Sequence, residues 1–598
     1  MAISAINLGN SFTNANGSPV LSGFSSGLNT DTIITSLVSA QTSQVTSLQD
    51  QITVNNSKTS AFTSLQQILT QFQTAANALA APQSPDSTTN LFAFRSSKVS
   101  GNTSQASSNY LSVDVSTLAS LGDYTISNIT STAAATIQES SAFTLPSANT
   151  SVVTASATSG FFIAGTFTIK GQDITLTAGE TLNQVVDAFN AVKSTTGIGA
   201  TAIQTAVGVY KIAFTGTNTG LANAFDLSSN GTVTSGRSAV LGQLSFANDQ
   251  TASDASFKFN GVTVARPTNS VSDIVNGVTF NILQNTNNET NPSLKISVLA
   301  DTTSISNGIT NFANAYNNFL TFYAKQTQID STTGQPAKTA ILSNDTTLNS
   351  IYTKLTTLAS SIVNGISGDN PQTLNDLGIS FVDVPATDTT PDIPNAFSID
   401  STALQNALKN NLVGVENIFG YNATSSSSNL AVFNPPNDQT ISDFKINVDQ
   451  IGKTYTAKYT NSSGVAQTIN LTKSTIGSSN AISLSAPSGS GLEGLSLIYA
   501  GGGSESNIDV SSINGISSQI NYFLKTATDK NIGLIANEKT AIATKNTTTK
   551  TQIDNVNTQI NAKKQQLLTK FSELEAAISK ANSSLNYLNA QQSAKSSG

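Results

Sequence analysis

The sequence predicts an α+β multidomain protein, in which a coiled-coil-like helical leg made from both chain termini carries β-rich head domains inserted between them. Two observations lead to this fold class. Both ends of the 598-residue chain show apolar residues at helical spacing, whereas the middle alternates short strand-like runs with Gly, Asn and Ser turns. Since neither end can bury its apolar stripe alone, pairing of the two ends is the simplest arrangement.

Thr30 and Asp31 come just before the N-terminal stripe, where a hydroxyl or carboxylate caps the first turn of a helix. Pro82 and Pro85 close the stripe. At about 50 residues and ~75 Å it is too long for one small core, which favours a helical partner. A shortened step between Phe62 and Leu65 interrupts the heptad spacing of its apolar positions, which are Val45, Leu48, Ile52, Asn55, Thr59, Phe62, Leu65, Leu69, Phe72, Ala76 and Leu79.

The C-terminal stripe is longer and has one four-residue stutter after Leu567. Its positions are Ile542, Asn546, Thr549, Ile553, Val556, Ile560, Lys563, Leu567, Phe571, Leu574, Ile578, Ala581, Leu585 and Leu588. Polar residues at seam positions weaken a seam but can fix its register, and this applies to Asn55, Thr59, Asn546, Thr549 and Lys563. From Lys530 onward nine Lys face four acidic residues, and we interpret this excess as a solvated basic helix face.

The two stripes together give the candidate site, which is a packing surface rather than a catalytic centre. We expect the leg helices to pack through Val45, Leu48, Ile52, Phe62, Leu69, Phe72, Ile553, Val556, Ile560, Leu567, Phe571, Leu574 and Ile578.

Composition argues against an enzyme. The chain has no Cys and no His, so it lacks thiolate nucleophiles, Cys-ligated metals and the commonest general base. No motif fixes two carboxylates at a useful spacing. We therefore expect no catalytic residues, no cofactor and no bound metal.

Charge and hydropathy argue against two classes of partner, membranes and nucleic acids. Residues 1–22 lack the basic region and apolar core of a secretory signal, and no stretch approaches the ~18 apolar residues of a membrane span. We therefore expect no membrane insertion. A net charge of -7 without a basic stripe argues against nucleic acid.

The middle of the chain predicts β-rich domains. Residues 110–115 alternate as a half-buried strand does, and 122–126 open another strand. From Gly165 onward, a hairpin turning at 170–173 is followed by a helix with Leu182, Val185 and Phe189, and then by strands near 203 and 210–214. Further strands are expected at 444–448, 455–459, 469–471 and 495–499.

Several segments resemble the bacterial flagellar filament cap protein family, also called flagellar hook-associated protein 2. They are Gly27-Leu28-Asn29-Thr30-Asp31 before the first helix, DASFKFNGVTVARPTNSVSDIVNGVTFNIL (254–283), SISNGITNFANAYNNFL (304–320), Leu377-Gly378-Ile379 and SIDSTALQNALKNNLVGVENIFG (398–420). Residues 165–220 are similar to a small repeat inserted in flagellins and hook-associated proteins. Only 421–506 shows no family signature, and we interpret it as an inserted β-domain.

The resemblance implies a domain order that fits the residue patterns. We expect a disordered tail (1–27), N-terminal leg helices (28–93), an inner β-rich head domain (94–158 plus 246–299), an outer β-rich head domain (159–245), a helical leg or core region (300–420), an additional β-rich insert (421–506), C-terminal leg helices (507–590) and a disordered tail (591–598).

The resemblance also implies a function. Members of the family leave the cell through the flagellar type III channel and form a ring-shaped homo-oligomer at the distal tip of the filament, where flagellin is retained and folds. The implied partners are other copies of the chain, flagellin, the export apparatus and an export chaperone, and the implied location is secreted, at the filament tip. A cysteine-free chain suits export as an unfolded thread, because no disulfide can lock a loop beforehand.

Three alternatives remain at this stage. Another flagellar axial protein, either a hook-filament junction protein or a flagellin-like one, would share the terminal helices. A surface adhesin would share the Thr- and Asn-rich β-modules, but it ordinarily needs a signal peptide or an anchor. An extracellular hydrolase would need clustered carboxylates.

Overall fold

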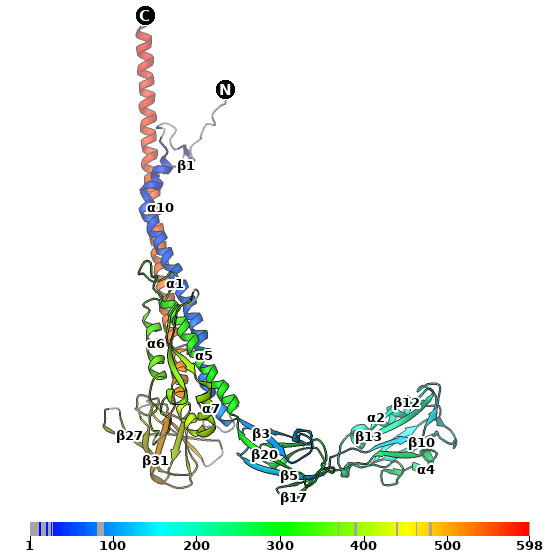
Figure 1. The fold of residues 1–598 in the computed structure, drawn as a ribbon. Helices are drawn as coiled ribbons and strands as arrows, with labels where there is room; N and C mark the ends of the chain where they lie inside the picture. Colours follow the sequence, from blue (N-terminus) through cyan, green and yellow to red (C-terminus); the bar gives the residue numbers. More distant parts are fainter. Residues whose placement is uncertain are drawn as a thin grey trace. The chain divides into compact units, whose positions relative to one another are not determined.

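The computed structural model describes residues 11–13, 19–21, 26, 28–80, 89–366, 368, 370–387, 391–437, 441–461, 463–477 and 481–596. The chain divides into two compact units, one formed by residues 1–80 with 308–598 and the other by residues 81–307. Helices dominate one part of the first unit, and antiparallel sheets make up most of the rest (Figure 1). This confirms the predicted α+β multidomain class.

Two long helices from the chain ends pack along each other in the first unit: α1 (Thr30–Leu79) and α10 (Leu534–Ser596). They are the blue and the orange-to-red helices of Figure 1. The side chain of Asn29, rather than Thr30 or Asp31, caps α1 by accepting from the backbone N–H of Thr32 at 3.1 Å. The closing Pro82 and Pro85 lie outside the described residues.

Shorter helices cover the part of the α1–α10 pair near the end of α1 and the start of α10, referred to here as the proximal part. The bounds are α5 (Thr302–Thr327, in this unit from residue 308), α6 (Thr346–Ala359), α7 (Ser401–Asn410), α8 (Leu412–Phe419) and α9 (Ile516–Ala527), with the 3₁₀ turn η4 (Asn375–Leu377). Asp345 and Asp400 cap α6 and α7 by accepting two backbone N–H groups each. None of the helices in the described part of the chain is both long and apolar enough to cross a membrane.

The first unit also contains a β-sandwich. Its five-stranded sheet has the order β23 (Tyr421–Ser425), β31 (Glu505–Asn514), β25 (Asp443–Asp449), β26 (Thr454–Thr460), β27 (Ala466–Asn470), and its four-stranded sheet has the order β24 (Leu430–Asn434), β30 (Ser496–Tyr499), β29 (Ile482–Ser485), β28 (Thr472–Thr475). One apolar core joins the two sheets. Two separate strand pairs are β1 (Ser11–Thr13) with β2 (Pro19–Leu21), and β21 (Ile379–Val384) with β22 (Ile393–Ile399).

The described residues of the second unit form two apolar cores, each within its own β-domain. The inner domain contains η1 (Leu91–Ala93), η2 (Ser107–Asn109) and two sheets, with the orders β17 (Val262–Arg266), β16 (Ala255–Phe259), β5 (Gly122–Ser131), β20 (Ser293–Ala300), β3 (Arg95–Gly101) and β18 (Ser270–Val275), β19 (Val278–Ile282), β4 (Leu111–Val115).

The outer domain combines sheets with short helices. Its elements are β12 (Ile198–Ala206), β13 (Val209–Gly216), β6 (Ile137–Ser140), β15 (Phe246–Gln250) and β7 (Phe143–Thr144) in one sheet, β11 (Gln172–Leu176), β10 (Gly165–Ile169) and β14 (Val233–Ser235) in another, the parallel pair β8 (Val153–Thr154) and β9 (Phe162–Ile163), and α2 (Leu182–Ala191), α3 (Lys193–Thr196), η3 (Leu221–Asn223) and α4 (Arg237–Val240).

The hairpin between β10 and β11 turns where the sequence predicted it. Lys170 and Gly171 both have positive φ, 43° and 80°, which a two-residue turn between twisted strands requires. The following helix α2 starts with a capping box, in which Thr181 and Gln184 each bond the other's backbone N–H. The predicted hairpin, helix and strands of this segment are confirmed.

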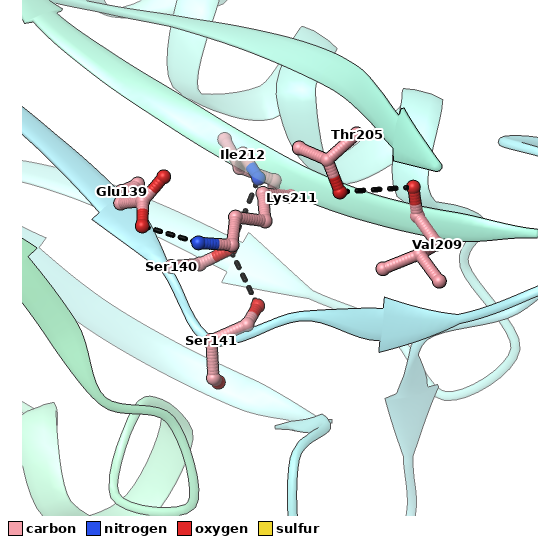
Figure 2. A network of polar contacts seen from close by, with 7 residues as sticks. All are labelled: Glu139, Ser140, Ser141, Thr205, Val209, Lys211 and Ile212. Carbon is pink, nitrogen blue, oxygen red and sulfur yellow. Dashed lines mark hydrogen bonds and ion pairs between the residues drawn. The ribbon is translucent and has the colours of Figure 1, made fainter. Parts of the chain in front are cut away.

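Strand β6 belongs to the outer domain, although the sequence placed it in the inner one. It lies between β13 and β15, and Figure 2 shows how side chains tie it to β13: Glu139 pairs with Lys211, and the hydroxyl of Ser140 accepts from the backbone N–H of Ile212 at 3.0 Å. The expected boundaries at 158 and 246 therefore move to a bridge between Ala134 and Ser253, which exchange both backbone hydrogen bonds. Strand patterns show that a segment is extended but not which sheet it joins.

Other expected boundaries also shift. The region 300–420 is not wholly helical, because β21 and β22 lie within it. The inserted β-domain ends at Asn514 rather than 506, since β31 pairs with β23 and β25, so residues 507–514 form a strand and no leg helix. Helix α10 continues through 591–596, where a tail was expected. Most of 1–27, and 597–598, lie outside the described residues.

Candidate interaction surface on the paired terminal helices

The seam between α1 and α10 contains an apolar cluster, referred to here as the distal cluster. Its buried members are Val38 and Val45 from α1, and Ile553, Val556 and Ile560 from α10, with Leu48, Ile52 and Leu567 packed against them. Seven of the residues predicted for the site are thus brought together here. The seam is short and made mainly of β-branched side chains, so it buries modest apolar area for helices of this length.

The C-terminal half of α1, which contains Phe62, Leu69 and Phe72, packs against elements other than the distal cluster. Phe62, Leu69 and Phe72 are fully buried, as a packing role requires, but the ring of Phe72 lies 5.3 Å from that of Phe312 and 6.0 Å from that of Tyr316, both in α5. The two stripes were expected to pack together, but Phe72 contacts α5 instead of the C-terminal stripe. A heptad pattern shows which face is apolar but not which helix covers it.

An aromatic cluster surrounds this point. The ring of Tyr316 packs against that of Phe397 of β22 in a tilted arrangement with ring centroids 4.2 Å apart, and Phe312 contacts Phe419 of α8 at 5.8 Å. The side chain of Asn317 bonds both backbone groups of Phe397, at 2.8 and 2.9 Å, and so acts as a neighbouring strand would. This cluster joins α1, α5, α8 and β22, and no spacing rule in the sequence indicated it.

Helix α9 covers the end of α1. The hydroxyl of Ser517 donates to the backbone oxygen of Ala76 at 2.9 Å, and the side chain of Gln66 donates to the backbone oxygen of Thr528 at 3.2 Å. Beside them runs a polar groove of about 970 Å³, lined by Thr63, Gln66, Gln67, Thr70, Gln71, Lys530, Ala536, Lys539 and Thr540. These lining residues offer amides, hydroxyls and ammonium groups, but no acid-base pair that could carry out catalysis.

Polar residues interrupt the seam. Asn55 is only 7% exposed, and its side-chain Nδ2 donates to Oδ1 of Asn546 at 2.8 Å, while Nδ2 of Asn546 donates to Oδ1 of Asn56 at 3.1 Å. Thr549 is also buried. Lys563 is exposed, so its predicted place in the seam is wrong. Its long charged side chain remains in water, where it avoids the desolvation penalty of a buried ammonium.

The distal end of the seam differs from the prediction. Phe571 and Ile578 are partly buried, but Leu574 is 44% exposed, and the buried positions are Ser572 and Glu575. Ser26 donates both its backbone N–H and its hydroxyl to Glu575, so the face of α10 that meets the N-terminal segment is the one with Glu575 and not the one with Leu574. Nothing in the sequence pattern pointed to this contact.

Beyond Ser579, the described side chains of α10 are exposed, including the apolar Leu585, Tyr587 and Leu588. In Figure 1 this red end of α10 extends past the start of α1. Within the described residues, no group of three His, Cys, Asp or Glu side chains is placed to hold a metal ion.

Three family models match the chain. Residues 26–136 match the flagellar hook-associated protein 2 N-terminus, 252–583 its C-terminus, and 166–218 the flagellin hook IN motif. The second match alone spans more than half of the chain and includes the inserted β-sandwich.

Sequence identity to individual relatives is low. The flagellar hook-associated protein 2 of Escherichia coli K12 is 27% identical over 66% of this chain and 78% of its own length. The A-type protein of Pseudomonas aeruginosa and the protein of Helicobacter pylori 26695 are both 28% identical, but the match spans only 52% and 26% of their lengths. The solved flagellar cap protein FliD D1-D2-D3 domains from Escherichia coli share 24% identity, with a TM-score of 0.40 over 60% of this chain and 89% of that one.

Proposed function

Because this chain belongs to the flagellar hook-associated protein 2 family, we propose that it is a structural capping protein at the distal tip of a bacterial flagellar filament. It acts there as a ring-shaped homo-oligomer that retains exported flagellin and promotes its folding and insertion. Its partners are other copies of the chain and flagellin.

The observation that carries this proposal is the pairing of α1 with α10. The two ends of the chain form one helical leg, and the β-domains are inserted between them in the sequence. The leg is suited to packing against the helices of filament subunits, and the β-domains are suited to forming the body of the cap. The leg contains the residues of the distal cluster together with the end of α10 beyond Ser579, where no described residue of the chain covers Leu585 or Leu588 and both are exposed to a neighbour.

The composition of the seam supports a contact that is repeatedly broken and remade. Asn55 and Asn546 interrupt it, and the distal cluster has Val and Ile where a tight zipper would have continuous Leu. A cap has to change position each time a subunit is added beneath it. A leg that packs through modest, polar-interrupted surfaces can be released more readily than one with an unbroken apolar seam.

Export and location follow from the same role. The chain is secreted through the flagellar type III channel, with the export apparatus and an export chaperone as partners, and the absence of cysteine is compatible with passage as an unfolded thread. The role requires no catalysis, so we propose that the protein is not an enzyme. It requires no cofactor either.

Filament binding tests the proposal. Purified, gold-labelled protein is added to filaments from cells that lack this gene product, and the particles are located by electron microscopy. A cap binds at one end of each filament. Binding along the sides would favour a flagellin-like or adhesive role, binding only at isolated hooks would favour a junction protein, and both outcomes would overturn the proposal.

A further inference from the structure

Two segments of the first unit differ strongly in charge. Residues 355–408 contain six Asp and neither Lys nor Arg, whereas residues 530–598 contain nine Lys and four acidic residues. A surface on which charges of one sign gather attracts a surface of the opposite sign and repels its own kind. Each segment is therefore suited to bind the other, either within one chain or between two copies.

The basic surface is the polar groove beside α9, whose charged lining residues are Lys530 and Lys539. Nζ of Lys539 donates to the hydroxyl of Thr63 at 3.1 Å, and neither lysine forms an ion pair within the part of the chain that the structure describes. The carboxylate next to Lys530, that of Asp529, instead accepts backbone N–H groups of the turn that follows it. The groove thus offers two ammonium groups that a bound carboxylate can neutralise.

The acidic surface is the hairpin of β21 and β22, referred to here as the acidic hairpin. A side chain of α5 bonds the backbone of β22 on its outer edge, but no third described strand pairs with β21, so the outer edge of β21 is open. Val382 and Val384 of β21 are 39% and 40% exposed, and Asp383 and Asp392 beside them are exposed too. An open strand edge with exposed apolar side chains is a surface suited to a partner.

The two surfaces lie on opposite sides of α1 and at the same level along it. Thr63 of the groove and Phe72 are nine residues apart, or about two and a half helical turns, so their side chains point in opposite directions. Phe72 packs on α5, which holds β22 through Tyr316 and Asn317. The groove continues along α1 to Gln71, the neighbour of Phe72. The acidic hairpin is therefore turned away from the groove of its own chain.

We propose that the polar groove of one copy binds the acidic hairpin of a second copy. Asp383 and Asp392 pair with Lys530 and Lys539, and the exposed valines of β21 pack on the aliphatic stems of these lysines. Because the two surfaces differ and lie on opposite sides of α1, the contact is head to tail, and such a contact generates a ring when its rotation closes. The inference rests on the proposed function, since it assigns a leg contact within the proposed ring.

Photo-cross-linking tests this contact on the purified full-length chain and needs no filament. The chain has no cysteine, so Gln67→Cys gives one attachment point for a benzophenone maleimide in the groove, and Thr558→Cys gives one at an exposed position of α10 outside it. Each labelled variant is mixed with an excess of isotopically heavy, cysteine-free protein and irradiated. Mass spectrometry then identifies the cross-linked peptides, and a heavy peptide comes only from a second copy.

We expect the Gln67→Cys probe to capture heavy peptides from residues 379–399, and the Thr558→Cys probe to capture none of them. Lys530→Glu with Lys539→Glu in the labelled chain should lower this capture roughly tenfold. Asp383→Lys with Asp392→Lys in the heavy protein should then restore it, because opposite charges again face each other, whereas damage to the fold would not be repaired in this way.

Three results overturn the proposal: no capture of residues 379–399 by the Gln67→Cys probe, capture of light peptides alone, or capture of added flagellin in place of the second copy. The binding of gold-labelled native protein to filament ends is measured separately. Binding at one end together with any of these three results would leave the proposed function standing, so the two proposals can fail independently.

Discussion

The carboxylate of Glu575 accepts hydrogen bonds from both the backbone N–H and the hydroxyl of Ser26, a residue 549 positions earlier in the chain. Glu575 is only 6% exposed, and it lies where the pairing of α10 with the N-terminal segment ends. A buried carboxylate is tolerated in such a place only when donors satisfy it. Ser26 supplies those donors and so attaches the chain just before α1 to the far end of the leg.

We expect Glu575→Ala to loosen this attachment. Ser26 would lose its acceptor, at a local loss of about 1–3 kcal/mol, and amide exchange of residues 28–34 should become faster. Exchange followed by mass spectrometry measures this. The control is Glu573→Ala, which removes an exposed carboxylate from the same helix turn. Equal exchange in the two variants would contradict a holding role for Glu575.

The hydroxyl of Tyr316 gives a second prediction. It is fully buried and has no hydrogen-bond partner among the described residues, while its ring packs on Phe397. We expect Tyr316→Phe to leave the free energy of unfolding unchanged or to raise it slightly, because an unsatisfied polar atom is removed. Tyr316→Ala should lower it by roughly 3–5 kcal/mol through the cavity it leaves. Urea unfolding distinguishes the two, and a loss above about 1 kcal/mol in Tyr316→Phe would show that the hydroxyl is bonded.

Tyr499 predicts an alkaline loss of stability in the β-sandwich. Burial, with a smaller contribution from the hydrogen bond to Glu505, raises the pKa of Tyr499 to about 12. The ordinary pKa of a tyrosine is about 10. Since the folded state holds the neutral phenol, its contribution is complete below pH ~10 and is lost as the pH rises through about 12. Thermal unfolding from pH 9 to 12 should therefore show a smaller decrease in Tyr499→Phe than in the native protein. Identical pH profiles would rule out this assignment.

The sequence predicted individual strands and hairpins more accurately than it predicted which strands pair with one another. The alternation around Leu111 and the turn at Lys170-Gly171 gave strands and a hairpin, because these signals are local. Ile137 to Ser140 also looks like a strand, but its partners β13 and β15 lie many residues away and share no local pattern with it. Non-local pairing depends on tertiary packing, so the domain boundary at 158 was wrong.

In the candidate site, too, the local apolar pattern was predicted correctly and a non-local contact was missed. Heptad spacing correctly predicted the burial of Val45, Ile553, Val556 and Ile560. Apolar residues at this spacing lie on one face of a helix, so the sequence shows which face is buried. Leu574 was misplaced because the face of α10 that meets the N-terminal segment here contains Glu575, which accepts hydrogen bonds from Ser26. A single polar contact of this kind leaves no periodic signal.

The corrected outer domain can be tested with two fragments. Residues 134–253 include β6, β7 and β15, and Ala134 and Ser253 are hydrogen-bonded to each other at the two ends. We expect this fragment to fold alone and to melt cooperatively. Residues 159–245 lack the strand between β13 and β15 and the core residues Phe143 and Val152, so they should remain unfolded. Cooperative melting of the shorter fragment alone would restore the boundaries predicted from the sequence.

Filament growth with Leu48→Asp and Ile560→Asp together measures most directly whether the terminal helices form a leg that caps the filament. Both side chains pack in the distal cluster, and burial of each contributes roughly 1.5–3 kcal/mol, so two carboxylates there should separate α1 from α10 while the β-domains stay folded. The matched control is Gln49→Asp with Gln559→Asp, which adds the same charges at exposed neighbouring positions. Electron microscopy should show normal filaments in control cells, but few filaments and secreted, unpolymerised flagellin in cells with the seam variant. Filaments of normal length in those cells, with the helix content of the purified variant unchanged, would contradict both the leg and its role in capping.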